Sequence, residues 1–235
     1  MPSLTCVMPT TNSRRWCIPW AIEYFLRQDF DDASLLIVGD GAERISDLVP
    51  DHPRVQYEHI ADARLPLGEK YNCCVDLAQT PWVALWSDDD WQASWRLSYT
   101  FGRVAMTPGV EIASTNKLLF YNLLSRKMWR YSCPSRSRDL IGGALVFHKD
   151  YWKRHPFEPH RRRGSDTRFT QAMSADEYRR VALVLEDSLF YVAMDHLTNT
   201  GRDHNYDDER WSEVGLRLAD VVGASDAQRY DLRLS

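Results

Sequence analysis

The chain has 235 residues, a formal net charge of −4 and 44% apolar residues, values that suit a single α/β domain of ordinary composition. There is no general basic footprint, so the sequence gives little support to a nucleic-acid partner. No apolar run reaches about 18 residues, so we expect no membrane-spanning segment, and the first residues lack the pattern of a signal peptide. The five cysteines contain no Cys-x-x-Cys pair, which favours free thiols in a cytoplasmic protein.

Three short apolar runs in the first 90 residues predict strands, at residues 4–8, 34–38 and 81–86. A further strand is predicted at residues 55–60, after Pro53. Helical patterns at residues 16–28 and 68–79 lie between them. Nearly all-apolar strands in this alternation are typical of a mostly parallel sheet with helices on both faces. Such sheets bind ligands beyond the carboxyl ends of their strands. Thr10, Asp40 and the Asp88–Asp90 run follow three of these strands, so we expect them to meet at one sheet edge.

The second half has a less regular pattern. Strands are predicted at residues 110–114, 118–121, 141–147, 181–185 and 189–194. Helices are predicted at residues 95–106, 150–155, 167–178 and, as an amphipathic helix, 206–222. Residues 126–139 are polar and rich in Arg and Ser, which predicts a loop. No linker separates this half from the first, so we expect both to belong to one domain.

Three consecutive carboxylates, Asp88, Asp89 and Asp90, follow the strand at residues 81–86. Adjacent carboxylates repel one another unless a positive charge lies among them. Mg²⁺ or Mn²⁺ with oxygen ligands is the usual solution, and it leaves positions open for phosphate oxygens. Alternation along a strand would put Asp88 and Asp90 on one side, so these two are the expected metal ligands. A solvated acidic turn before the helix near residue 93 is the alternative interpretation.

Four motifs occur in a characteristic order in the first 100 residues. They are Met8-Pro9-Thr10-Thr11-Asn12, Val38-Gly39-Asp40-Gly41, Gly68-Glu69-Lys70-Tyr71-Asn72 and Leu85-Trp86-Ser87-Asp88-Asp89-Asp90. Together they resemble the family 2 glycosyltransferases of the GT-A fold, whose metal motif is of the Asp-x-Asp type. The sequence departs from that pattern at Gly39 and Ser87, where relatives often have acidic residues. The nucleotide base and the exact metal ligand therefore stay open.

The resemblance implies a GT-A-type, Rossmann-like and mostly parallel central sheet with helices on both faces and a small acceptor-side subdomain. Residues 1–92 would form the nucleotide-sugar-binding half, residues 93–204 the acceptor-binding and catalytic half, and residues 205–235 a C-terminal helix and tail. The implied donor is a UDP-, GDP- or dTDP-sugar, the implied acceptor is a sugar or glycan, and the implied cofactor is Mn²⁺ or Mg²⁺. The implied substrate-binding residues are Pro9, Thr10, Asp40, Lys70, Asn72, Asp88, Asp89, Trp91 and Gly143.

Two motifs extend the resemblance into the second half. Ile141-Gly142-Gly143-Ala144 resembles the family's acceptor-side segment, and Arg163-Gly164-Ser165-Asp166 resembles the motif that carries the base of inverting enzymes. Asp166 is thus the expected general base, which would take the proton of the acceptor hydroxyl. An N-cap for the helix at residues 167–178 is the alternative.

His196 follows the last predicted strand and resembles a late histidine that completes the metal site in several GT-A enzymes. A purely structural histidine is the alternative. Trp86, Trp91 and Trp95 either stack on an acceptor sugar or pack in the core.

We therefore expect a metal-dependent glycosyltransferase, inverting with Asp166 as general base, in the cytoplasm or at the inner membrane surface. Two alternatives stay open. One is a nucleotidyltransferase of similar sheet architecture, although residues 10–15 contain no glycine for a phosphate loop. The other is a non-catalytic sugar-nucleotide-binding module. The sequence indicates neither the donor sugar, the acceptor and linkage, nor the oligomeric state.

Overall fold

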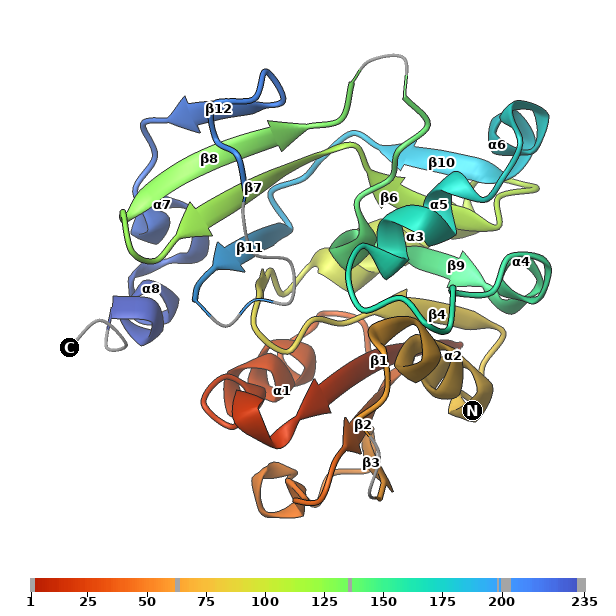
Figure 1. Cartoon of the computed structure of the whole chain (residues 1–235), viewed down its shortest axis with the longest axis horizontal. Helices are drawn as coiled ribbons and strands as arrows, with labels where there is room; N and C mark the ends of the chain where they lie inside the picture. Colours follow the sequence, from red (N-terminus) through yellow and green to blue (C-terminus); the bar gives the residue numbers. More distant parts are fainter. Residues whose placement is uncertain (1–2, 62–63, 135–136, 198, 200–203, 232–235) are drawn as a thin grey trace.

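The computed structural model describes residues 3–61, 64–134, 137–197, 199 and 204–231. Its main feature is a seven-stranded sheet in the order β10-β6-β9-β4-β1-β2-β3 (Figure 1). The strands are β1 (Leu4–Thr11), β2 (Ala33–Asp40), β3 (Val55–Ile60), β4 (Trp82–Leu85), β6 (Ile112–Thr115), β9 (Val146–His148) and β10 (Ala182–Leu185). All neighbours are parallel except that β9 runs antiparallel to β4 and β6. The expected mostly parallel α/β sheet is confirmed.

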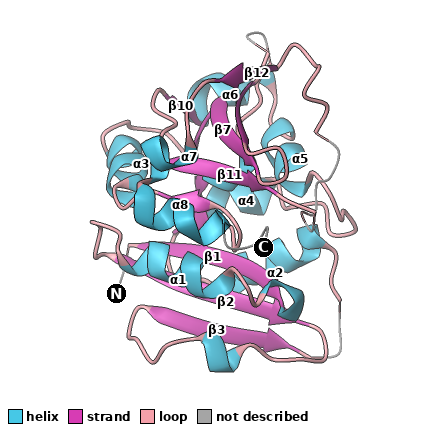
Figure 2. Ribbon diagram, turned by 90° about the vertical axis from the view of Figure 1, so that its left-hand side faces the viewer, coloured by secondary structure: helices cyan, strands magenta, loops and turns pink. Residues whose placement is uncertain are grey.

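Alternating apolar residues divide the core between the two faces of this sheet. On β1, Cys6 and Met8 pack in one cluster, whereas Val7 belongs to the other. The first cluster includes residues of α1 (Ile18–Leu26), α3 (Arg96–Ala105), α7 (Leu218–Val222) and α8 (Ala224–Asp231). The second includes residues of α2 (Leu67–Leu77), α4 (Lys149–Arg154), α5 (Ser165–Gln171) and α6 (Ala175–Val181). Helices thus cover both faces, as expected, and Figure 2 shows α1 and α2 against the strands of the first half.

A second, five-stranded sheet has the order β12-β8-β7-β11-β5. Its strands are β5 (Trp91–Gln92), β7 (Lys117–Asn122), β8 (Lys127–Ser132), β11 (Tyr191–Asp195) and β12 (Trp211–Val214). The structure also contains three short 3-10 helices, η1 (Asn12–Arg14), η2 (Ser46–Leu48) and η3 (Gly142–Ala144). Because β5 follows directly after the acidic run, this sheet begins at the candidate metal site.

Three predictions from the second half are wrong. The predicted loop at residues 126–139 contains β8, whose pairing with β7 and β12 outweighs its polar composition. The predicted helix at residues 206–222 is β12 followed by α7, because Trp211 to Val214 extend the sheet beside β8. The predicted helix at residues 167–178 is two helices, because the Ser174 hydroxyl accepts a hydrogen bond from the Glu177 amide and starts α6.

The structure also bears on the cysteines and on membrane crossing. None of the five cysteines forms a disulfide. In the part of the chain that the structure describes, no helix is both long enough and apolar enough to cross a membrane.

Candidate functional site

The carboxyl ends of β1, β2 and β4 meet at one edge of the large sheet. Thr10 Oγ1 donates a 2.6 Å hydrogen bond to Asp88 Oδ2. Lys70 Nζ, from α2, forms a 2.6 Å ion pair with Asp40 Oδ1 and donates to the Thr10 carbonyl at 3.1 Å. The predicted meeting of these three polar groups is confirmed. Asp40 and Lys70 are both buried, and Asp40 Oδ2 accepts a hydrogen bond from the Leu65 amide. The ion pair therefore holds the ends of β1 and β2 in place relative to α2.

The three carboxylates of the acidic run bind to three different parts of the fold. Strand β4 ends at Leu85, so the run forms a turn, and strand alternation does not apply to it. Asp88 bonds to β1 through Thr10. Asp90 bonds to β11, where it accepts hydrogen bonds from the Tyr191 hydroxyl and, at 2.8 Å, from the Met194 amide.

Asp89 is the carboxylate of the run that lies between two basic side chains. Its Oδ2 lies 2.8 Å from Arg14 Nη1 and 3.1 Å from His196 Nε2. Arg14 Nη1 and His196 Nε2 are themselves 3.1 Å apart. Sequence reasoning did not assign Arg14 to the site, although it follows closely on the end of the first strand.

Burial acts on all three carboxylates, and the partners of Asp89 separate its charge state from those of Asp88 and Asp90. Burial and then repulsion by Asp89 raise the pKa of Asp88 to about 6 and that of Asp90 to about 7. Burial also acts to raise the pKa of Asp89, but the His196 hydrogen bond and the Arg14 charge outweigh it, so this pKa is lowered. Asp89 is therefore the fully ionised member of the run at neutral pH.

The side chains near Asp89 that could coordinate a divalent cation form only part of a metal site. Among the described residues, no three His, Cys, Asp or Glu side chains are grouped so that they could hold a metal ion. Asp89 and His196 could supply one carboxylate and one imidazole. Mg²⁺ and Mn²⁺ sites often use one or two protein ligands and complete their shell with phosphate oxygens and water. Asp88 and Asp90, the expected carboxylate ligands, are bonded instead to Thr10, Tyr191 and Met194, so a metal site at this run stays a prediction.

Asp166 lies in the first turn of α5, next to the glycines of η3. Gly164, with φ of +61°, holds the N-cap position, so the alternative that Asp166 is the N-cap is wrong. A Cβ atom added to Gly142 would overlap the Asp166 carboxylate, so the glycine permits this close approach. Burial raises the pKa of Asp166, partly offset by hydrogen bonds from the Thr167 amide and its own amide.

A cavity of about 600 Å³ joins the acidic run to Asp166, a size that is common for ligand sites. The expected site residues that line it are Pro9, Thr10, Lys70, Asp88, Asp89, Asp90, Gly143 and Asp166. Tyr71 also lines it. Burial and then the charges of Asp166, Asp88 and Asp89 raise the pKa of Tyr71, so its phenol stays neutral beside these carboxylates.

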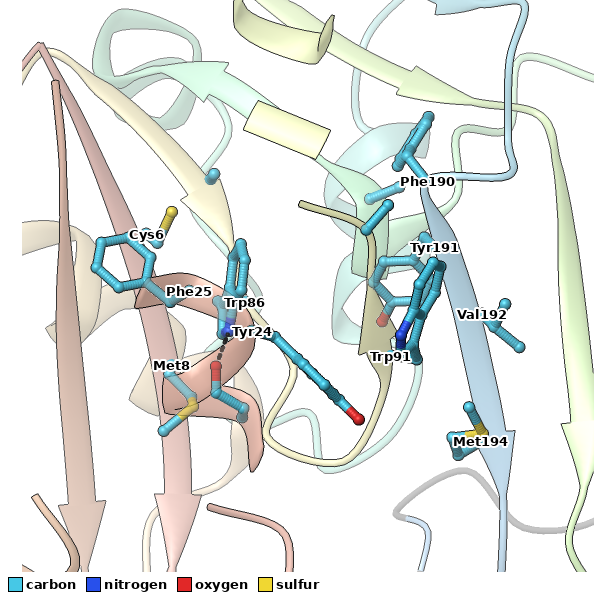
Figure 3. Packing of buried hydrophobic residues seen from close by; sticks show 14 of the residues in the cluster. Cys6, Met8, Tyr24, Phe25, Trp86, Trp91, Phe190, Tyr191, Val192 and Met194 are labelled. Atoms are coloured by element: carbon cyan, nitrogen blue, oxygen red, sulfur yellow. Dashed lines mark hydrogen bonds between the residues drawn. The ribbon is translucent and has the colours of Figure 1, made fainter. Parts of the chain in front are cut away.

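Two expected binding residues have structural contacts instead. Trp91 is buried, and its indole donates a 2.7 Å hydrogen bond to Asp226 of α8. Asn72 is bonded through both side-chain atoms to Phe157 and through its oxygen to Trp152. Figure 3 shows Trp86 and Trp91 within the apolar cluster. These side chains belong to the packing of the fold, which was the alternative interpretation of the tryptophans.

Further aromatic residues that sequence reasoning missed line the cavity from the second sheet. They are Phe120 on β7, Tyr131 on β8 and Trp211 on β12. Tyr131 lay in a predicted loop and Trp211 in a predicted helix, which concealed the face that they share with Phe120. On β8 itself, the charged residues Lys127 and Arg130 lie on opposite faces and hide the alternation.

Comparison with known proteins gives structural matches only. No protein-family model matches this sequence, and no curated protein sequence matches it. The structure of S. aureus TarS 1–349 in complex with UDP-GlcNAc is similar with a TM-score of 0.64 and 13% identity, over 87% of this chain and 62% of that one. The same protein in complex with UDP gives a TM-score of 0.63 and 15% identity, over 83% and 60%.

The mannosyltransferase PcManGT from Pyrobaculum calidifontis, in complex with GDP-Man and Mn²⁺, has a TM-score of 0.60 and 16% identity, over 83% of this chain and 56% of that one. The chain spans about 60% of the length of the TarS 1–349 structures. At such identities the likeness concerns the fold, and it confirms the expected GT-A-type glycosyltransferase fold.

Proposed function

We propose that the chain is a glycosyltransferase that moves a sugar from a nucleoside diphosphate sugar to an acceptor hydroxyl. The observation that carries the proposal is the single cavity that holds Asp89, Arg14 and Lys70 at the strand ends together with Asp166. Fold likeness alone does not give an activity, but it agrees with this site, since the matched structures contain UDP, UDP-GlcNAc or GDP-Man.

The donor diphosphate would bind beside the acidic run. Carboxylates repel phosphate oxygens, so cations must lie between them. Arg14 offers a guanidinium that suits phosphate oxygens, and Asp89 with His196 would hold Mn²⁺ or Mg²⁺. When bound, the metal would act as a Lewis acid that stabilises charge on the leaving diphosphate. Lys70 contributes indirectly, because its ammonium orients Asp40 and the end of β1.

Asp166 would act as the general base. The carboxylate that accepts the acceptor's proton must reach its hydroxyl and have a pKa nearer to neutrality than that of an exposed carboxyl group. Asp166 lines the cavity, and burial raises its pKa. If Asp166 removes the proton while the hydroxyl attacks the anomeric carbon directly, the product has the inverted configuration.

The test is Mn²⁺-dependent turnover of a panel of UDP-, GDP- and dTDP-sugars, followed by release of the nucleoside diphosphate. We expect one donor class to be hydrolysed or transferred, and chelation to stop it. Asp166→Asn should abolish transfer and retain binding of the donor, measured by calorimetry. Turnover of no sugar nucleotide, together with no binding of UDP, GDP or dTDP, would refute the proposal.

A further inference from the structure

Four aromatic side chains from the second half form a continuous wall at one end of the cavity. Phe120, Tyr131, His204 and Trp211 all line the cavity, and we call them the aromatic wall. The Trp211 ring centre lies 4.8 Å from Phe120, 4.9 Å from Tyr131 and 5.1 Å from His204. Trp211 is therefore the centre of the group. In Figure 1 the strands that carry three of them, β7, β8 and β12, lie side by side.

Sheet pairing fixes these rings in place before any ligand arrives. Tyr131 is the direct partner of Trp211 in the antiparallel β8–β12 pair, and β7 pairs with β8 throughout its length. Cross-strand aromatic neighbours of this kind stabilise a sheet. The four rings are nevertheless only partly buried. Large rings that stay partly exposed inside a cavity, held by a rigid sheet, are typical of a ligand-binding surface.

Polar groups lie at the edge of the same wall. Asp139, Asn205 and Arg210 also line the cavity. The Arg210 guanidinium lies 5.8 Å from the Tyr131 ring centre and is held by Asp208 at 2.8 Å. A pyranose ring has C–H groups on its faces and hydroxyl groups around its edge. Aromatic faces bordered by amide, carboxylate and guanidinium groups match both parts of such a ring.

We propose that the aromatic wall is a glycan-binding subsite, with Trp211 as the ring on which a pyranose stacks. If the proposed function is correct, the sugar bound there is the acceptor. Only this acceptor role depends on the proposed function; glycan binding by the wall does not. The guanidinium that suits a diphosphate, that of Arg14, lies with its partner Asp89 at the strand ends of the large sheet, whereas the wall belongs to the second sheet. Asp166 lines the same cavity.

The test measures glycan binding directly by saturation-transfer NMR on the full chain. The probes are methyl glycosides of glucose, galactose, mannose and N-acetylglucosamine, with cellobiose and maltose as disaccharides. We expect saturation of the ring C–H protons of at least one probe. Trp211→Leu should weaken its binding by at least about tenfold, and Trp211→Tyr should retain most of it.

Trp95→Leu is the matched control. Trp95 does not line the cavity, and its ring packs against Tyr99 and Phe190, with ring centres 5.7 Å and 6.1 Å away. The substitution removes the same side-chain volume away from the aromatic wall and should leave glycan binding unchanged. Thermal melts monitor folding, and if Trp211→Leu does not fold, Tyr131→Leu makes the same test.

The outcomes separate this proposal from the proposed function. Loss of glycan binding in folded Trp211→Leu with retained UDP or GDP binding supports the subsite. Loss of nucleotide binding in Trp211→Leu instead would assign the wall to the donor base and overturn the proposal. Equal glycan binding by wild type and Trp211→Leu would also overturn it, because the wall would then serve only in packing. If the wild type binds glycans and no sugar nucleotide, the proposed function fails and the subsite stands.

Discussion

The contact between Gly142 and Asp166 allows the role of Asp166 to be tested without altering its carboxylate. In Gly142→Ala, the new Cβ would overlap Oδ2, Cβ and Cγ of Asp166, each well inside the 3.0 Å that real Cβ contacts essentially never pass. Gly142 is not among the glycines with positive φ, so alanine fits its backbone. Because the overlap includes Asp166 Cβ, which side-chain rotation cannot move, the perturbation is a displacement of Asp166 as a whole relative to η3.

The overlap requires Asp166 to move by on the order of 1 Å or more, and a displacement of about 1 Å at a reacting group can cost about 100-fold in rate. We therefore expect kcat of Gly142→Ala to fall by about 100-fold or more, with little change in donor KM. Overpacking at such a site costs about 1–3 kcal/mol of unfolding free energy, so the variant should still fold. The fall in kcat caused by Gly142→Ala should not add to the fall caused by Asp166→Asn, because both substitutions impair the same carboxylate.

The assay is release of nucleoside diphosphate from the donor identified by the panel, with urea unfolding in parallel. Gly102→Ala is the control, because a Cβ at Gly102, inside α3, meets nothing within 4 Å. It should keep full activity and gain up to about 1 kcal/mol in helix stability. A folded Gly142→Ala variant with kcat within threefold of wild type would refute the argument that the position of Asp166 controls turnover.

Three further perturbations probe other contacts of the fold and the site. The pKa of Asp90 is raised to about 7, above the unfolded value near 4. Its protonated form therefore stabilises the folded state fully below about pH 4, and this stabilisation is lost as pH rises through 7. Asp90→Asn should flatten the fall in unfolding free energy between about pH 4 and 7 in urea titrations. Asp226 accepts hydrogen bonds from Arg27 at 3.0 Å and from the buried Trp91 indole. Asp226→Ala should lower the unfolding free energy by about 1–3 kcal/mol, because it leaves the Trp91 N–H unpaired, whereas an unchanged urea midpoint would contradict the anchoring of α8. The guanidinium of Arg14 lies against Asp89; Arg14→Gln should tighten Mn²⁺ binding without nucleotide, measured from the free Mn²⁺ signal by electron paramagnetic resonance, and an unchanged affinity would show that Arg14 does not compete with the metal.

The first half of the fold could be predicted from the sequence because its signals are local. The four strands there were found at nearly the observed positions. Three of them come from mostly apolar runs, as is typical of parallel strands covered on both faces, whereas β3 lies at the edge of the sheet and mixes polar and apolar residues. The meeting of Thr10, Asp40 and Asp88 also follows from local signals, because topology brings the ends of parallel strands to one edge. Such rules need no knowledge of the distant sequence.

The second sheet could not be predicted in the same way. Strand β8 is a run of charged and aromatic residues, and only its pairing with β7 and β12 makes it a strand. Propensity for strands depends strongly on such partners. The same reason explains why the aromatic wall was missed, since Tyr131 and Trp211 are 80 positions apart in sequence and become neighbours through the register of β8 and β12.

The acidic run shows how remote partners give adjacent, identical residues different functions. Asp88, Asp89 and Asp90 differ only in what they contact: Thr10 lies 78 positions away from Asp88, His196 lies 107 away from Asp89, and Met194 lies 104 away from Asp90. Asp90 thereby connects the acidic run to β11, and β9 pairs with β4 in the large sheet. The sequence pattern changes near residue 92, but residues from before and after that position pack together. A cavity that is lined by the acidic run and by the aromatic wall of the second sheet requires such connections, because both must keep a fixed position relative to Asp166.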